Sequence, residues 1–386
     1  MLNEYLGVCA DQMIERGRLL LAKIPRRLPV EYSGLVELCR MRLNAAIADF
    51  RSLKQSLGDE RVPASVHQRL FRRAVGELDL IEMVGIVALA RAEQDDHRLS
   101  VLLHEICREI RYPRPVPVVT TLSRQYFHIY PAFNLLFVPL TEGYFLLHLP
   151  DLYHELGHPL IADENDPLVE PFKVQCATSA GEAHAYFTAE RIREERGRGP
   201  REIALVLENA AQSWLWYWTV EFYCDLFAVA TLGPAFPWAH LHLHAKRGRD
   251  PYEVPRRGPT SHPADAARMH VLLNALKKLG FDTDAQEIAA CWQQLLANIG
   301  AAAEPEYHRC YPESLMEVCV SHALEGVQRI GCRIAAPGTT DRVHAVLNEA
   351  WRKVWRQAGD YVRWERNSVE ALLSPPRAAV GSERAR

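Results

Sequence analysis

The chain has 386 residues, of which 48% are hydrophobic and 24% are charged, and its formal net charge is −3 at pH 7. This composition is typical of a folded globular protein, and so small a charge gives no electrostatic reason to expect a nucleic-acid partner. Nine cysteines spread along the chain show no disulfide framework, and the first residues lack the features of a signal peptide. No uncharged apolar stretch of about 18 residues or more occurs, so we expect a soluble, cytoplasmic protein without a membrane span.

The first part of the chain, up to about residue 110, carries apolar positions every three or four residues, which is typical of helices. We expect these helices at 6–22, 32–57 and 66–92. A proline-rich crossing at 113–117 then leads into short β-branched and aromatic runs. These runs, at 116–121, 126–130 and 132–139, predict the strands of a small sheet.

The most informative stretch of the chain is the HExxH segment from His154 to His158. Its apolar spacing, with Pro150 in the first turn, predicts a helix. On a helix, two histidines four residues apart stand on one face and can bind the same metal ion. Glu155 would then lie beside the ion, where it could act as a general base towards water. This is the pattern of zinc hydrolases, which are usually peptidases.

Two further residues in and after this segment bear on the shape and packing of the predicted helix. Pro159 follows the second histidine directly and would kink or end the helix there. Gly157 has no side chain and would allow another helix to approach closely, although a helix can also simply tolerate a glycine.

A catalytic zinc ion needs a third protein ligand, and the chain offers several candidates. Glu182 and His184 have no acidic residue one turn further on that could support a ligand histidine. Glu221 lies in a long apolar run and is followed one turn later by Asp225, which could hold the other N–H of a ligand histidine. Glu221 is therefore the preferred third ligand. The alternative is that the two buried acids form an internal salt bridge with an arginine.

Three motifs together resemble those of a known enzyme family. HELGH is followed by E-x-x-x-D and then by an H-P-x-x-x-x-R element at 262–268. From roughly residue 115 to residue 275 the chain therefore resembles the gluzincin metallopeptidases, in particular the HtpX-like and CAAX prenyl-protein protease group. The resemblance does not cover the membrane helices of most of those relatives. It implies a Zn²⁺ site and a cleft formed by His154, His158, Glu221, His262 and Arg268.

His262 precedes a proline at the junction of a loop and a helix, where a histidine can donate a hydrogen bond to the oxyanion formed from a substrate carbonyl. Arg268 could bind that carbonyl or brace Asp225, and we expect it to stabilise the oxyanion together with His262. Tyr144 and Tyr223 are alternative donors, and His262 could instead be only a helix-entry residue. In gluzincins an edge strand pairs with extended substrate, which gives the segment 132–138 that role unless it is an interior strand.

The rest of the chain is again helical in pattern, with helices expected at 174–195, 201–232, 265–300, 312–331 and 341–373. A basic, proline-bearing loop at 246–259 precedes His262 and could select substrates by charge. His240, His242 and His244 alternate in a way that suits a strand or a second metal cluster, but a polar helix end or loop fits the surrounding sequence better.

Taken together, these patterns predict an α+β protein that is mostly α, with a zincin-like catalytic domain flanked by helical regions. We expect an N-terminal helical region at 1–112, the catalytic domain at 113–300, a C-terminal helical region at 301–373 and a disordered tail at 374–386. The predicted function is a zinc-dependent, selective metallopeptidase that cleaves peptide or protein substrates. The alternatives are a non-catalytic zinc-binding regulatory or scaffold protein, and a zinc amidase acting on a non-protein substrate. Glu155 favours catalysis, because a purely structural site has no use for an acid there.

Overall fold

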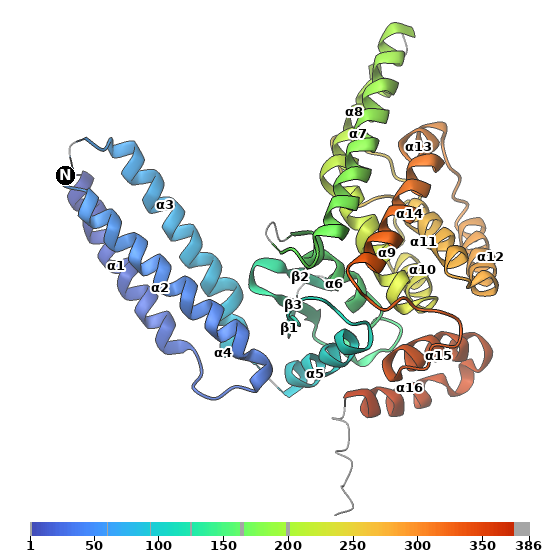
Figure 1. The fold of residues 1–386 in the computed structure, drawn as a ribbon, viewed down its shortest axis with the longest axis horizontal. Helices are drawn as coiled ribbons and strands as arrows, with labels where there is room; N and C mark the ends of the chain where they lie inside the picture. The colour runs from blue at the N-terminus through green and yellow to red at the C-terminus, as the bar shows by residue number, and fades with distance from the viewer. Residues whose placement is uncertain are drawn as a thin grey trace, which may run out of the picture. The chain divides into compact units, whose positions relative to one another are not determined.

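The computed structural model describes residues 2–59, 61–92, 94–123, 126–162, 166–197 and 201–373. The chain divides into two compact units, whose elements are labelled in Figure 1. Unit 1 comprises Met1–Val101 and Pro117–Leu140, and unit 2 comprises Leu102–Val116 and Thr141–Arg386. This division groups the strands with the N-terminal helices, so it does not follow the boundaries predicted at 112 and 300. The tail predicted at 374–386 lies outside the described residues.

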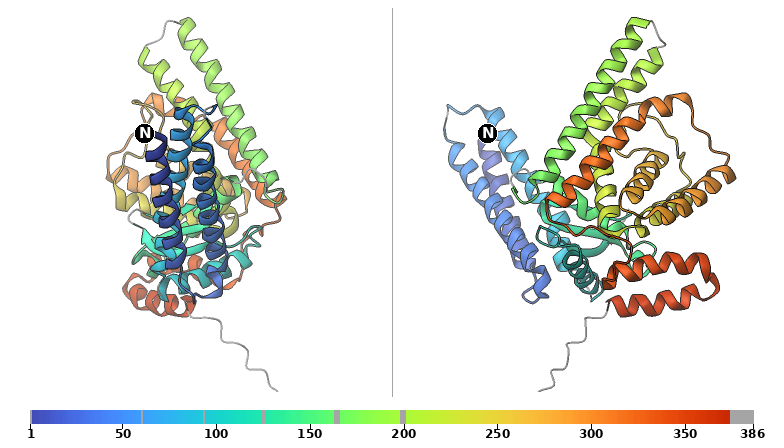
Figure 2. Two further views of the ribbon diagram at one scale, coloured as in Figure 1. Left: turned by 90° about the vertical axis from the view of Figure 1, so that its left-hand side faces the viewer. Right: turned by 45° about the vertical axis from the view of Figure 1, so that its right-hand side comes forward.

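Unit 1 is built around three long helices that run side by side, as Figures 1 and 2 show. They share a core that includes the fully buried side chains of Leu43, Phe50 and Leu78. The helical elements of this unit are α1 (Leu2–Lys23), η1 (Val30–Tyr32), α2 (Ser33–Ser56), α3 (Ala64–Leu80), the π-helix η2 (Ile81–Ile86), α4 (Val87–Ala90), the first part of α5 (Gln94–Glu109) and η3 (Pro131–Phe133). The three helices predicted before residue 110 are confirmed.

The sheet of unit 1 has three described strands, β1 (Val118–Ser123), β2 (His128–Tyr130) and β3 (Leu135–Pro139), in the order β1-β3-β2. β3 pairs in parallel with β1 and in antiparallel fashion with β2. The predicted small sheet is therefore confirmed. The expectation that 132–138 supplies an edge strand for substrate is wrong, because β3 already has a partner on each side.

The outer edge of β1 is closed by side chains of α5. The backbone N–H of Thr121 donates to a carboxylate oxygen of Asp96 at 2.7 Å, and the N–H of Val119 donates to the hydroxyl of Ser100 at 3.0 Å. These two N–H groups point away from β3, where an additional strand would otherwise find them. The helix thus satisfies the donors of this edge.

Unit 2 is organised around α9 (Thr219–Leu232), which packs against α6, α7, α10, α11 and α14. Every residue of α9 from Phe222 to Leu232 is buried. The other helical elements of the unit are η4 (Glu142–Tyr144), α6 (Asp151–Ala162), α7 (Glu170–Gly197), α8 (Arg201–Ser213), the π-helix η5 (Trp214–Trp218), α10 (Ala235–Arg247), α11 (Asp265–Lys278), α12 (Asp282–Asn298), α13 (Pro305–Cys310), α14 (Glu313–Arg329), α15 (Arg342–Arg356) and α16 (Ala358–Leu373).

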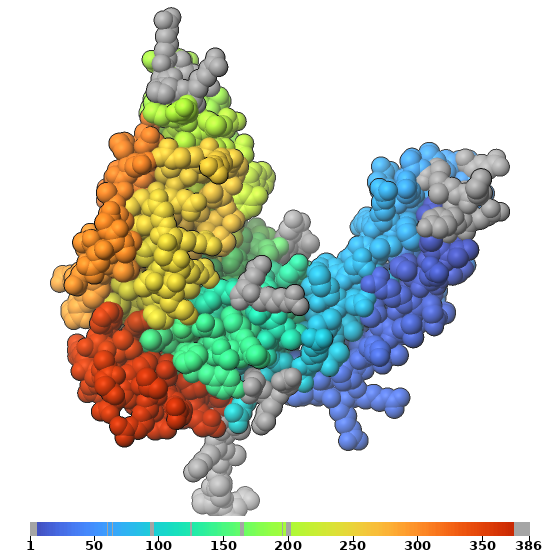
Figure 3. All heavy atoms as spheres, turned by 180° about the vertical axis from the view of Figure 1, so that it is seen from behind, coloured from blue at the N-terminus to red at the C-terminus, as the bar shows by residue number. Residues whose placement is uncertain are grey.

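Most of the helices predicted for this unit are present, but two of them are interrupted. The helix expected at 265–300 breaks between α11 and α12 at Gly280, whose φ of 82° is left-handed. The helix expected at 341–373 breaks at Gln357, and its halves, α15 and α16, pack against each other. On the face of unit 2 drawn in Figure 3, these two helices (red) lie beside the yellow and orange segments of α10 to α12.

The predicted fold class is thus confirmed at the level of a mostly helical protein with one small sheet. None of the described helices combines the length and the apolar character that a membrane span needs.

Candidate metal centre

The HExxH segment lies on α6, as its apolar spacing predicted. The first turn forms directly after Pro150, whose carbonyl accepts a hydrogen bond from the N–H of Tyr153 at 3.0 Å. His154 and His158 therefore stand one turn apart on the same helix. Pro159 lies inside α6, which continues to Ala162, so this proline does not end the helix.

Gly157 sets the distance between α6 and α9. A Cβ atom added at this position would lie 2.8 Å from the Cα atom of Cys224, which is closer than side chains tolerate. Only glycine allows the two helices to approach so closely, as the sequence predicted. Because Glu221 precedes Cys224 by three residues, the same close approach brings its carboxylate towards the two histidines.

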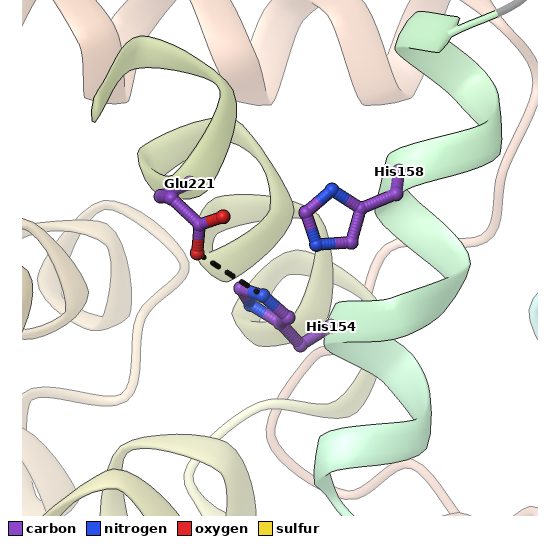
Figure 4. Close-up of side chains that lie close together, drawn as sticks. All are labelled: His154, His158 and Glu221. Carbon is purple, nitrogen blue, oxygen red and sulfur yellow. Dashed lines mark ion pairs between the residues drawn. The ribbon is translucent and has the colours of Figure 1, made fainter. Parts of the chain in front are cut away.

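His154, His158 and Glu221 converge on one point in unit 2. Each offers one ligand atom, and these atoms all lie within 4.8 Å of one another. Figure 4 shows both imidazoles projecting from α6 towards the carboxylate on α9, with the Nε2 atom of His154 lying 3.5 Å from Oε2 of Glu221. The structure thus brings together the two histidines and the third ligand that the sequence preferred.

The surroundings of Glu221 suit a cation. Its Oε2 atom is buried and has no hydrogen-bond partner among the described residues. Leaving a carboxylate oxygen in this state is costly unless a positive charge compensates it. Two imidazoles and one carboxylate also form the ligand set of many catalytic zinc sites, in which a fourth position stays open. The residues therefore fit a zinc ion, and they leave room in the coordination sphere for a further ligand.

Asp225 contacts the ring nitrogen of His154 that does not face Glu221. Its Oδ1 atom lies 2.8 Å from Nδ1 of His154, so the carboxylate can accept the Nδ1–H and leave Nε2 directed at Glu221. Arg268 in turn donates from Nε to Oδ2 of Asp225 at 2.7 Å and from Nη2 to Oδ1 at 2.6 Å. The internal salt bridge that the sequence left open as an alternative is therefore present, but it involves Asp225 and leaves Glu221 facing the histidines.

The two carboxylates change the basicity of the cluster. Burial opposes protonation of His154, but its hydrogen bond to Asp225 and the nearby carboxylate of Glu221 outweigh that effect and raise its pKa to about 10. Burial would also raise the pKa of Glu221, yet the neighbouring His154 brings it down to about 2. For His158, burial and then the charge of His154 lower the pKa to about 4. The ionised carboxylate of Glu221 is a suitable metal ligand, and His154 would have to release a proton to bind the same ion.

His262 and Arg268 lie near the cluster but in different positions. The side chain of His262 is 57% exposed, and its Nε2 atom lies 3.8 Å from Oε2 of Glu221. His262 thus stands at the solvent side of the cluster, where a substrate could reach it. Arg268 is mostly buried and forms an ion pair with Asp225. This pairing favours the predicted role of bracing Asp225 over direct contact with a substrate.

Tyr223 is not placed to act as an oxyanion donor. It is fully buried, and its hydroxyl lies 2.9 Å from that of Ser179 on α7. Because Tyr223 is two residues beyond Glu221, it points to another side of α9. Tyr144 belongs to the short helix η4 and stays an alternative donor.

The loop that carries His262 is anchored by residues that the sequence did not single out. The N–H of Thr260 donates to the hydroxyl of Ser213 at 2.9 Å, and the indole N–H of Trp218 donates to the hydroxyl of Thr260 at 3.1 Å. The N–H of Ala264 donates to the hydroxyl of Tyr311 at 2.9 Å. These contacts join segments that lie far apart in the sequence, so no local pattern could have revealed them.

Glu155 is buried on α6, directly after His154 in the sequence. Its charge is one of those that raise the pKa of Cys224 on α9, after burial and Glu221.

The other metal-ligand candidates lie elsewhere. Glu182 and His184 are exposed on α7. His240, His242 and His244 lie on α10. Of the structures that the sequence left open for this segment, the helix is therefore the correct one, and the strand and the loop are not. Among the described residues, His154, His158 and Glu221 form the only group of three or more ligand side chains close enough to hold a metal ion.

Comparison with protein-family models, with curated proteins and with solved structures finds no match to this chain. The resemblance to gluzincins therefore stays a prediction that rests on the motifs alone.

Proposed function

We propose that this protein is a zinc-dependent hydrolase, most simply a metallopeptidase of the gluzincin type with a zincin-like catalytic centre. The observation that carries the proposal is the convergence of His154, His158 and Glu221, whose ligand atoms lie within 4.8 Å of one another. The Asp225–Arg268 pair behind His154 supports it, because ligand histidines in zinc enzymes usually donate their second N–H to a carboxylate.

A bound zinc ion would lower the pKa of water towards neutrality and polarise a substrate carbonyl. Glu155 would take a proton from the attacking water and later deliver it to the leaving amine nitrogen. His262 would donate a hydrogen bond to the carbonyl oxygen as negative charge develops there. Asp225 and Arg268 are positioning residues in this proposal, since they fix the orientation of the His154 ring and do not touch the substrate.

The test combines metal analysis with one conservative substitution. The protein, purified without chelators, should contain one zinc ion per chain and should cleave members of a peptide library. Glu155→Gln keeps the shape of the side chain but removes the base, so cleavage should fall by about 10²–10⁴-fold while zinc stays bound. Glu182→Gln is the matched control, because this exposed glutamate on α7 was the rejected ligand candidate and should be dispensable.

The outcomes separate the alternatives. Full activity in Glu155→Gln would refute the assigned base. Bound zinc without hydrolysis of any peptide or amide would indicate a regulatory or scaffold protein in place of a hydrolase. Cleavage of small amides but not of peptides would indicate an amidase. A chain that binds no zinc at all would overturn the proposal.

A further inference from the structure

Unit 2 contains a second site that is separate from the metal centre. A cavity of about 410 Å³ lies between the start of α10, α12, the segment 336–340 and α15. Its volume falls within the range of about 300–1,000 Å³ that is typical of small-molecule sites. None of the residues that line it belongs to the His154–His158–Glu221 cluster or to its supporting pair.

One wall of the cavity is aromatic. The rings of Trp238 and Trp351 are stacked, with centroids 5.9 Å apart, and Trp355 lies 5.1 Å from Trp238. Trp355 lies at the end of an amphipathic helix, where a tryptophan could be buried at little cost. It is nevertheless 53% exposed. Three indoles around an open cavity form a surface on which a flat or bulky apolar group can pack.

The remaining walls carry charges of both signs. Asp284 and Glu287 come from α12, whereas Arg352 and Arg356 come from α15. Among the described residues, no ion pair joins these two acids to these two arginines. Arg352 donates to Glu349 at 3.0 Å on its own helix. Burial, and then the charge of Glu287, raise the pKa of Asp284, and the charges of Arg352 and Arg356 oppose this shift only in part, so a ligand cation beside the two acids would stabilise the ionised form of Asp284.

We propose that this cavity binds a small zwitterion with a large apolar or aromatic side chain, that is, a free amino acid or a dipeptide. The ammonium group would lie near Asp284 and Glu287, and the carboxylate near Arg352 and Arg356. The side chain would pack on Trp238 and Trp355. The two acids and two arginines cancel in charge, which favours a zwitterion over a nucleotide, whose phosphates would meet Asp284 and Glu287.

Binding can be measured by isothermal titration calorimetry on the full chain, with L-phenylalanine as the first probe. Saturable binding is expected. Phenylalaninamide, which lacks the carboxylate, and N-acetylphenylalanine, which lacks the ammonium group, should each bind about tenfold more weakly or worse. Phenylalanyl-glycine, titrated into the Glu155→Gln variant so that it stays intact, distinguishes a free amino acid from a peptide as the preferred ligand.

Paired variants locate the binding site. Asp284→Asn and Arg356→Gln should each weaken binding of L-phenylalanine about tenfold. Their matched controls, Asp282→Asn on the exposed part of α12 and Arg366→Gln on α16, do not line the cavity and should leave affinity unchanged. Trp355→Leu changes an exposed side chain, so it should fold normally and weaken binding of the aromatic probe.

Three results would overturn the proposal. They are the absence of saturable binding by any zwitterion at millimolar concentration, equal losses in the cavity variants and their controls, and preferential binding of a mononucleotide. This proposal does not depend on the metal centre, since zinc content and peptide cleavage are measured separately.

Discussion

Two groups in unit 2 have the same local pattern but different surroundings. His154 and His158 lie four residues apart on α6 and face Glu221 from α9, whereas His240 and His244 lie four residues apart on α10 and face Asp265 at the start of α11. In both groups two imidazoles from one helix face an acidic residue on another.

The difference lies in which polar atoms are already satisfied. His244 lies 2.7 Å from the Asp265 carboxylate, and His240 lies 3.0 Å from the backbone carbonyl of the same residue. In the other group, Oε2 of Glu221 is buried without a hydrogen-bond partner among the described residues. Identical spacing can therefore serve a helix junction or a candidate metal site, and the carboxylate oxygen without a hydrogen-bond partner distinguishes the two groups.

The largest expected effect tests this comparison directly. Glu221→Ala removes one of three ligands and should lower zinc affinity by at least about 100-fold, beyond the range seen when a supporting residue is lost. Asp265→Ala, the equivalent change in the other group, should leave zinc affinity unchanged. Competition with a fluorescent zinc chelator measures both values. Equal losses in the two variants would show that the groups do not differ as described.

A smaller change addresses the residue behind His154. Asp225→Asn keeps the shape of the side chain but removes its charge, so it should weaken zinc binding by about 10–100-fold. Asn can still accept the Nδ1–H of His154, while Arg268 loses its ionic partner. The same chelator competition reports the affinity, and circular dichroism confirms that the helices persist. Unchanged affinity would contradict a positioning role for Asp225.

The close approach of α6 and α9 can be broken without touching a ligand. Gly157→Ala places a Cβ atom against the backbone of Cys224 and should lower the free energy of unfolding by about 1–3 kcal/mol. Gly181→Ala on α7 is the control, because nothing lies within 4 Å of an added Cβ atom there. Urea denaturation measures both. Equal stability of the two variants would contradict the claim that Gly157 sets the helix spacing.

The effect expected at the helix junction between α10 and α11 depends on pH. Burial would raise the pKa of Asp265, but His244 and then the charges of His240 and Arg268 lower it to about 2. Because the folded pKa is depressed, the ionised group stabilises the fold above the unfolded value near pH 4, and this contribution is lost as pH falls towards 2.

Asp265→Asn should therefore lower the free energy of unfolding by about 2 kcal/mol at pH 7. Denaturation midpoints of variant and wild type should differ by a constant amount from pH 7 down to pH 4 and converge below that. A difference that grows on acidification would contradict the sign of this effect.

Much of the local structure could be predicted because it depends on local spacing. The helix carrying His154 and His158 follows from its apolar periodicity, and Glu221 follows from an acidic pair in an apolar run. Those signals need no knowledge of distant contacts. The strands were found for the same reason, since β-branched and aromatic runs are local features.

Features that depend on tertiary context could not be predicted. The order β1-β3-β2 places the third strand in sequence at the centre of the sheet, and no residue pattern within 132–139 indicates this central position. The anchoring of the His262 loop by Ser213 and Tyr311 joins residues 47 positions apart in each case. Arg268 could equally have faced a substrate or Asp225, and only the folded chain distinguishes these positions.

The closed edge of β1 has a consequence for self-association. Val118 and Val119 are buried, and a β-strand of this kind is prone to recruit other chains if its edge is open. Asp96 and Ser100 cap that edge from α5, which leaves β2, only three residues long, at the other side of the described sheet. The native fold thereby offers little template for intermolecular aggregation through this sheet.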